Sequence, residues 1–136
     1  MKPVVLVCTL NRASCHRLIR AGKRLAEQQS LPLQVLSVQP EGLVSPAVAE
    51  TIQVVHNLSS AAGAEVTVLF SDSPALTAAV HAKQQNAAYL LCDRADMPGT
   101  AALGTLRELV PEITLSVLEA DGHLITFPAL QSVSAG

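Results

Sequence analysis

Five short aliphatic runs, separated by stretches with helical periodicity, constrain the fold of this 136-residue chain more than any other feature. The runs are Val4–Thr9, Leu33–Gln39, Ala64–Ser71, Ala87–Cys92 and Ile113–Ala120. Continuous apolar runs of this length are typical of strands that a parallel sheet buries on both faces. Their alternation with helices predicts an α/β fold, a doubly wound open parallel sheet of five strands with helices on both faces.

The segments between the runs carry helix signals. The first helix is expected to begin near Ala13 or Ser14, with Asn11 or Ser14 as its cap, and to end before Pro32. One face of it is apolar at helical spacing: Cys15, Leu18, Ile19, Gly22, Leu25 and Ala26. The strand–loop–helix unit Val4–Ala26 should supply the central strand and one wall of any ligand crevice.

Three further helices are predicted. The second, Pro46–Ala62, has Glu50 as its only charge, so it is either well buried or pressed against a partner. Its core stripe is expected to be Val48, Ile52, Val55 and Leu58. A third helix opens at Ser73–Pro74 and runs through Gln85, and a short fourth spans Thr100–Leu109.

The C-terminal region carries a hairpin signal. Asp121–Gly122 lies between two apolar runs, so residues 123–127 should return as a sixth, antiparallel strand. That strand could pair with its own sheet or with a second copy of the chain. Residues 1–130 are predicted to form one domain, and residues 131–136 a flexible tail.

Composition excludes several classes of function. The net charge is −2, and the only aromatic residues are Phe70, Tyr89 and Phe127, which argues against nucleic-acid and membrane partners. The sequence shows neither a signal-peptide pattern nor an apolar run near 18 residues. Three cysteines, an odd number, point to a reducing compartment, so the expected location is the cytoplasm.

Basic residues gather on the first helix. Five of the nine Lys and Arg residues are Arg12, Arg17, Arg20, Lys23 and Arg24. Charges at helical spacing are most often a solvated face, and the alternative is an anion site or partner surface.

Nucleophilic and metal chemistry find weak support. Cys8 ends the first strand, where low-molecular-weight tyrosine phosphatases and phosphotransferase IIB domains place a cysteine, but the arginine those phosphatases need six residues later is replaced by Ser14. A buried packing cysteine is the simpler interpretation. The histidines, read as surface or interface residues, show no ligand spacing, so no metal site is predicted. They are His16, His56, His81 and His123.

Polar residues cluster after the strands, where such folds bind ligands. Asp72 and Asp93 follow the third and fourth strands, although Asp72 also suits the start of a helix. The segment CDRADMPGTAALGT, with Gly99, Gly104 and Thr105, could offer N–H groups and a hydroxyl to an anion, but it matches no standard phosphate-loop motif.

Several segments together resemble the universal stress protein family. They are the first strand with the helix LIRAGKRLAEQ, the strand LQVLSVQ, the helix led by Ser73–Pro74 and the helix carrying Gly104–Thr105. The likeness covers roughly residues 3–120, and the first helix and second strand look most like the domain embedded in potassium-sensing histidine kinases. It implies strand order 3-2-1-4-5 and often a homodimer through strand five.

Nucleotide-binding members carry an acidic residue after strand one and a glycine-rich loop after strand four. Here the acidic position reads Leu10 or Asn11, and Cys92 and Ala95 replace the first two glycines. Only Gly104–Thr105 fits the last pair. Side chains in place of those glycines keep the backbone from a triphosphate, so ATP binding is expected to be lost or altered.

Three hypotheses follow. The first is a non-catalytic module that works by association without a cofactor, and it is expected to form a dimer through strand five, the hairpin and the second helix. The second is a sensor for ATP, another adenine nucleotide or a cyclic dinucleotide. Its crevice would be lined by Thr9, Asn11, Arg12, Ser37, Asp72, Arg94, Gly104 and Thr105. The third, least favoured, is a Cys8-dependent phosphotransfer enzyme.

Overall fold

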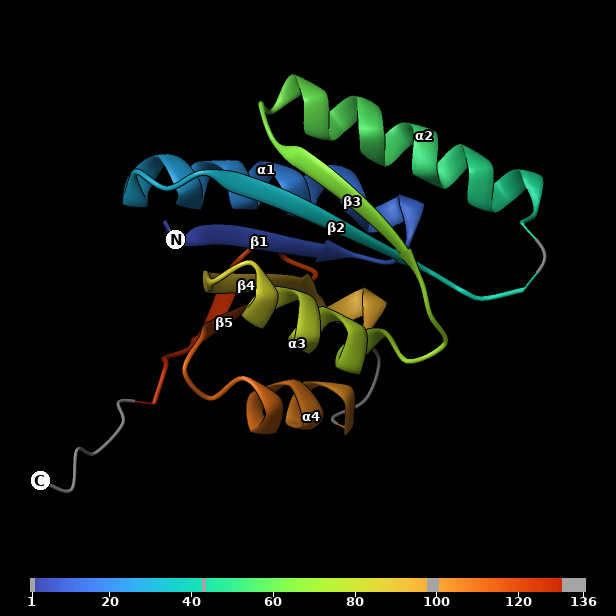
Figure 1. Ribbon diagram of the computed structural model, residues 1–136. Coiled ribbons are helices and arrows are strands. Elements are labelled where there is room, and N and C mark those ends of the chain that lie inside the picture. The colour runs from blue at the N-terminus through green and yellow to red at the C-terminus, as the bar shows by residue number, and fades with distance from the viewer. Residues whose placement is uncertain (1, 43, 98–100, 131–136) are drawn as a thin grey trace, which may run out of the picture.

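The computed structural model describes residues 2–42, 44–97 and 101–130 and shows one sheet between two layers of helices (Figure 1). The strands are β1 (Val4–Thr9), β2 (Leu33–Gln39), β3 (Glu65–Phe70), β4 (Ala87–Asp93), β5 (Thr114–Leu118) and β6 (Leu124–Phe127). The helices are α1 (Arg12–Gln29), α2 (Pro46–Ala61), α3 (Pro74–Gln84), the short 3-10 turn η1 (Arg94–Asp96) and α4 (Ala101–Leu109).

The sheet has six strands in the order β3-β2-β1-β4-β5-β6. The first five are parallel, and their order is the one that the sequence predicted. The expected hairpin strand extends the sheet to six, because β6 pairs antiparallel with β5 from Leu118↔Leu124 to Leu115↔Phe127. This pairing within one chain answers the question that the sequence left open.

Strand β1 is the centre of the molecule, and all six of its residues are buried. Helix α1 packs closely on it at Gly22, where a Cβ atom would lie 2.3 Å from a methyl group of Val7. Glycine is therefore required at this position, since any side chain would push the helix off the sheet.

Each face of the sheet has its own aliphatic core. Figure 1 shows α1 and α2 on one face and α3 and α4 on the other. Val5, Val7 and Val35 pack toward α1 and α2 with Leu18 and Val55. The residues between them on the strands pack toward α3 and α4: Val4, Leu6, Cys8, Leu36, Val38, Leu90 and Cys92. The doubly wound arrangement follows from this alternation.

Several predicted boundaries and burial patterns need correction. Helix α1 begins at Arg12, earlier than expected, and Asn11 stands at its cap position without capping it. Strand β5 is Thr114–Leu118, shorter than the predicted run. In the predicted core stripe of α2 only Val55 is fully buried, because α2 covers the edge of the sheet and leaves its flanks half-exposed.

The prediction that all four histidines are surface or interface residues was wrong for His81, which is buried within the chain. Its ring is buried on α3, and burial lowers its pKa below the ordinary value because the charged form loses hydration. The other three, His16, His56 and His123, are exposed.

Within the described residues, the helices are too short or too polar to cross a membrane. The predicted tail, residues 131–136, lies outside the described part of the chain, as does Thr100.

Candidate functional site

The loops after β1, β2, β3 and β4 meet at one edge of the sheet, because parallel strands end on the same side. The chain leaves β1 toward one side and β4 toward the other, so the topological switch point lies between these two strands. Ligands of open α/β folds bind in the crevice at such a point. This edge is the candidate site.

A carboxylate of the protein lies at the switch point, between η1 and the start of α1. Asp96, at the end of η1, is buried at 7% exposure. Its Oδ2 accepts a hydrogen bond from the Leu10 backbone N–H at 3.1 Å. Its Oδ1 accepts bonds from Asn11 Nδ2 at 2.8 Å and from Ser14 Oγ at 2.7 Å. Asp96 thus accepts hydrogen bonds from donors of the β1–α1 loop and of the first turn of α1.

Burial raises the pKa of Asp96 above its ordinary value, because a carboxylate loses hydration in this position. The bonds from Ser14, Leu10 and Asn11 act in the opposite direction, since they favour the ionised form. Nearby Asp93 adds to the rise. The negative charge of Asp96 would also repel an incoming phosphate group.

A second carboxylate, Asp93 at the end of β4, is held by an arginine of α1. The side chain is fully buried and accepts two bonds from Arg17, Nε to Oδ2 at 2.8 Å and Nη2 to Oδ1 at 2.7 Å. Arg17 Nη1 also donates to the backbone oxygens of Glu119 and Ala120, each at 3.3 Å. This two-pronged pair joins α1, β4 and the end of β5.

Arg94 makes a neighbouring ion pair, with Nη2 2.8 Å from Oε1 of Glu119. The guanidinium lowers the pKa of Glu119 below its ordinary value by stabilising the charged carboxylate. Arg94, which the sequence analysis offered as a ligand for a nucleotide, is therefore engaged within the protein.

The other half of the edge, beyond β2 and β3, is open. A pocket of about 240 Å³ lies there, lined by Leu10, Asn11, Val38, Pro40, Ser71, Asp72 and Pro74. Asp72 Oδ1 accepts a bond from the Glu41 backbone N–H at 3.0 Å, which ties together the loops after β2 and β3. Small-molecule sites usually measure about 300–1,000 Å³, so this pocket suits a ring-sized group rather than a whole nucleotide.

The structure brings together only part of the predicted site. Asn11 and Asp72 line the open pocket. Thr9 is buried at the end of β1, and its hydroxyl has no partner among the described residues. Buried Ser37 accepts a bond from Gln39 Nε2 at 2.9 Å, and the same amide donates to the Leu10 carbonyl at 3.2 Å.

The remaining predicted residues lie apart from that pocket. Arg12 pairs with Glu50 of α2 at the surface. Gly104 and Thr105 lie inside α4, where the Thr105 hydroxyl donates to the Ala101 carbonyl at 3.0 Å. Gly99 falls outside the described residues.

Sequence reasoning missed Asp96, Ser14 and Arg17 as residues of this edge. A usable signal was present: Asp93 and Asp96 directly follow the fourth strand, and Arg17 lies one turn and a half into the helix after the neighbouring first strand. The predicted strand order places those segments side by side. An acidic pair on one of these segments and an arginine on the other predict an ion pair between them.

The cysteines are buried, as expected for Cys8. Cys8 and Cys92 lie in the same core beneath the crevice, and both are at most 1% exposed. Burial raises the pKa of the Cys92 thiol to about 12, and that of the Cys8 thiol further still. Both thiols are therefore protonated at neutral pH, which disfavours attack on a substrate.

With this geometry in hand, the chain can be compared with solved structures. A universal stress protein from Archaeoglobus fulgidus is similar at a TM-score of 0.62 and 14% identity, over 88% of this chain and 98% of that one. The fold is that of the universal stress proteins. A second universal stress protein, solved in complex with cAMP, is similar at a TM-score of 0.58 and 15% identity, over 87% and 95% of the two chains.

Matches at the level of sequence are absent: no family model matches the chain, and no curated protein sequence does. The shared universal stress protein fold nevertheless makes the contents of the crevice the informative feature of this chain.

Proposed function

We propose that this chain is a non-catalytic module with the universal stress protein fold, which acts by association and has lost phosphate-dependent ATP binding. The observation that supports it best is the Asp96 carboxylate, hydrogen-bonded to Leu10, Asn11 and Ser14 at the switch point. Asp96 acts there as an internal anion, satisfying donors that a bound phosphate would need and adding a charge of the same sign.

The absence of catalysis is part of the same proposal. The buried, protonated Cys8 thiol supports it, because group transfer needs an accessible thiolate. Replacement Cys8→Ser should leave any phosphatase activity toward an aryl phosphate unchanged. An activity that the replacement abolishes would favour the phosphotransfer hypothesis instead.

A cytoplasmic regulatory or stress-response role, in the manner of the domains in potassium-sensing histidine kinases, completes the proposal. Its dimeric form would use the hairpin rather than β5 directly, because β6 occupies the outer edge of β5. Ile125 is exposed at 37% on β6 and would lie in such an interface. Light scattering at two concentrations tests this, and a monomer at both would contradict it.

A second candidate is a sensor for an adenine nucleotide or cyclic nucleotide. Two observations favour it: the open pocket with Asn11 and Asp72, and the similar protein solved with cAMP. The pocket would receive the base or sugar, and the phosphate would stay outside the part of the crevice between β1 and β4, where Asp96 lies.

A thermal-shift series with ATP, AMP, cAMP and a cyclic dinucleotide separates the two candidates. A ligand present at 100 times its Kd stabilises the folded protein by about 2.7 kcal/mol. We expect millimolar ATP to leave the melting temperature unchanged. A rise with ATP would contradict the loss of ATP binding.

A rise with cAMP or AMP alone would favour the sensor. The variant Asp72→Ala should then abolish that rise, whereas Lys83→Ala, an exposed change on α3, should keep it.

A further inference from the structure

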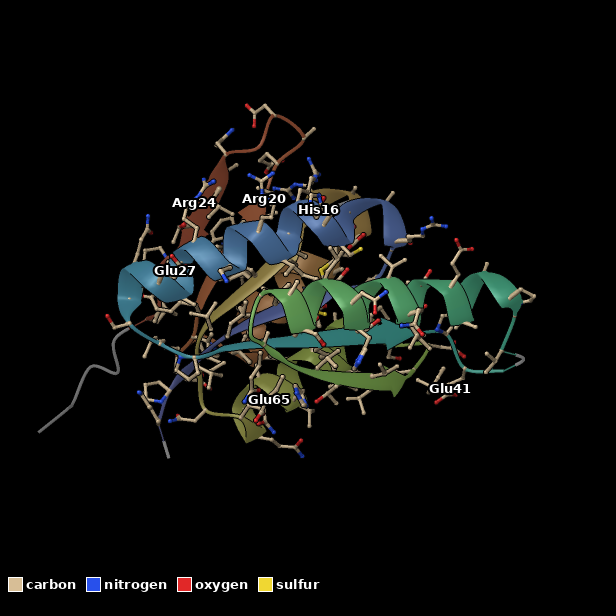
Figure 2. All side chains as sticks on the ribbon, turned by 90° about the horizontal axis from the view of Figure 1, so that it is seen from above. His16, Arg20, Arg24, Glu27, Glu41 and Glu65 are labelled. Atoms are coloured by element: carbon tan, nitrogen blue, oxygen red, sulfur yellow. The ribbon has the colours of Figure 1, made fainter. Side chains whose placement is uncertain are left out.

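Helix α1 presents a row of basic side chains to solvent. We call it the basic ridge, and its residues are His16, Arg20, Lys23 and Arg24, all exposed. Figure 2 looks down on α1 and shows His16, Arg20 and Arg24 in a row along the helix. Two other arginines of α1 do not belong to the ridge, since Arg12 pairs with Glu50 and Arg17 with Asp93.

The charges of the basic ridge are largely unpaired. Among the described residues, neither Arg20 nor Arg24 has a carboxylate within 4.0 Å. The only carboxylate that Lys23 reaches is Glu27, at 4.0 Å with both side chains exposed, and its Nζ also donates to the Ala62 carbonyl oxygen at 3.4 Å. An exposed pair at that distance contributes little, so the ridge keeps its charge for an outside partner.

An apolar groove runs beside the ridge, between α1 and α2. It holds a pocket of about 270 Å³, lined by His16, Ile19, Arg20, Lys23, Leu58, Ala61 and Ala62. The α2 wall of this pocket is uncharged, and buried Ile19 forms part of the α1 wall. The pocket is thus aliphatic on one side and basic on the other.

A second pocket, of about 200 Å³, lies on the opposite flank of α1. It is lined by Arg17, Arg20, Ala21, Arg24, Leu118 and Gly122. Arg20 borders both pockets, so a ligand that crosses the ridge meets this residue from either side. Arg20 is the natural centre of a docking surface.

We propose that the basic ridge and the α1–α2 groove dock an acidic segment of another protein, which places one aliphatic side chain in the groove and carboxylates on Arg20, Lys23 and Arg24. The proposal rests on the proposed function in one respect: it supplies a partner class for a module that acts by association. Arg20 and Arg24 are one turn apart, a rise of about 6 Å. Carboxylates four residues apart on a helix match this spacing.

Other polyanions fit the surface less well. A nucleic acid would use the ridge but leave the aliphatic pocket empty, and neither pocket is lined by a Phe, Tyr or Trp side chain that could stack on a base. A membrane surface would need large apolar side chains beside the charges. The large exposed apolar residues in the described part of the chain lie off α1: Val44, Phe70, Leu76, Val80, Ile125 and Leu130.

The test is an NMR titration of the isotope-labelled protein with a synthetic helical peptide of about four turns. The peptide carries glutamates four residues apart and one leucine on the same face. We expect shift changes confined to the basic ridge and the groove. The variant Arg20→Glu should weaken binding by about tenfold or more, and Arg20→Gln by less.

Matched controls make the result specific. The variant Lys83→Glu reverses an exposed charge on α3 and should leave binding unchanged. A peptide with lysine in place of glutamate should bind Arg20→Glu better than it binds the unaltered protein. A peptide with alanine in place of leucine should bind more weakly than the parent peptide.

Four results would each overturn the proposal: no shift changes at millimolar peptide, equal binding of a glutamine peptide, equal binding of the alanine peptide, or tighter binding of duplex DNA to the same residues. None of these results would affect the proposed loss of ATP binding at Asp96. Conversely, a thermal shift with ATP would contradict the proposed function and leave the ridge result standing.

Discussion

The sheet edge where the parallel strands end has two halves, which differ in how far their polar side chains are buried and hydrogen-bonded. Between β1 and β4, Asp93 and Asp96 are buried and saturated by bonds from Arg17, Ser14, Asn11 and the loop backbone. Beyond β2 and β3, the exposed Asp72 holds one backbone N–H, and a pocket of about 240 Å³ remains. The closed half and the open half share Asn11 as their border.

The difference shows that a fold can keep the strand order that forms its crevice while the side chains in the crevice change which ligands can bind. In the closed half, donors that point toward the switch point are consumed internally, and buried carboxylates make the site unfavourable for anions. In the open half, the same loop geometry leaves apolar and polar groups side by side. Changes in the closed half should therefore affect folding, and changes in the open half should affect ligands.

The largest effect is expected for Arg17→Ala in the closed half. It leaves the fully buried Asp93 without its cationic partner, and breaking a buried pair in this way costs about 3 kcal/mol. Arg17 itself is 37% exposed, which places the expectation at the lower end of the range. Urea denaturation monitored by circular dichroism measures it.

The variant Arg17→Lys is the control for charge alone. It keeps the positive charge but loses the two-pronged geometry, so its cost should fall between that of alanine and zero. If Arg17→Ala cost less than a surface pair, about 1 kcal/mol, Asp93 would have to be hydrated and the closed half would not be closed.

A smaller loss, about 2 kcal/mol, is expected for Asp96→Ala. The change leaves the Leu10 N–H, the Asn11 amide and the Ser14 hydroxyl without their acceptor, and part-buried unsatisfied donors are costly. The same freed donors should let inorganic phosphate stabilise the variant but not the unaltered protein. If phosphate did not stabilise the variant, the proposal that Asp96 takes the place of a bound anion would be contradicted.

The pH dependence should report the burial of Asp96 directly. Burial raises its pKa in the folded protein, so its stabilising contribution is full below the unfolded value, about 3.9, and is lost as pH rises through the folded value. Asp96→Asn removes this titration and adds a constant offset. The stability of the unaltered protein relative to Asp96→Asn should thus fall as pH rises just above 4, and a rise would indicate a lowered pKa.

The smallest effect is expected in the open half. Asp72→Ala removes one bond to an exposed loop, so the free energy of unfolding should change by about 0.5 kcal/mol or less. A loss as large as that of Asp96→Ala would show that the two halves do not differ in the way proposed. Chemical denaturation of both variants side by side provides the comparison.

The architecture was readable from the sequence because it follows from burial. Val4–Thr9 and its neighbouring runs are apolar throughout rather than alternating with polar residues, as is typical of parallel strands buried on both faces of a sheet. Gly22 lies on the predicted inner face of the first helix. The burial of the predicted α2 stripe was overestimated because helical periodicity shows which face of a helix points inward, but not how completely that face is covered. An edge strand such as β3 offers too little surface to bury that helix fully.

The site was harder to predict because its polar groups satisfy one another. The positions of Asn11 and Asp72 at this edge could be predicted because each follows a strand, and topology fixes where the strands end. Arg94 was also found by position, but its engagement with Glu119 depends on side-chain directions that no spacing encodes. Asp96 was missed because an acidic residue in a loop is ordinarily solvated, and only the contact with the β1–α1 loop makes it a buried acceptor.

Because the cysteine thiols are buried, their reactivity reports how often the folded structure opens. Cys8, Cys15 and Cys92 are free, and each is at most 1% exposed. An alkylating reagent therefore reacts with Cys8 or Cys92 only when the middle of the sheet separates, so the labelling rate at these two residues, resolved from that at Cys15, reports the free energy of that separation without denaturant.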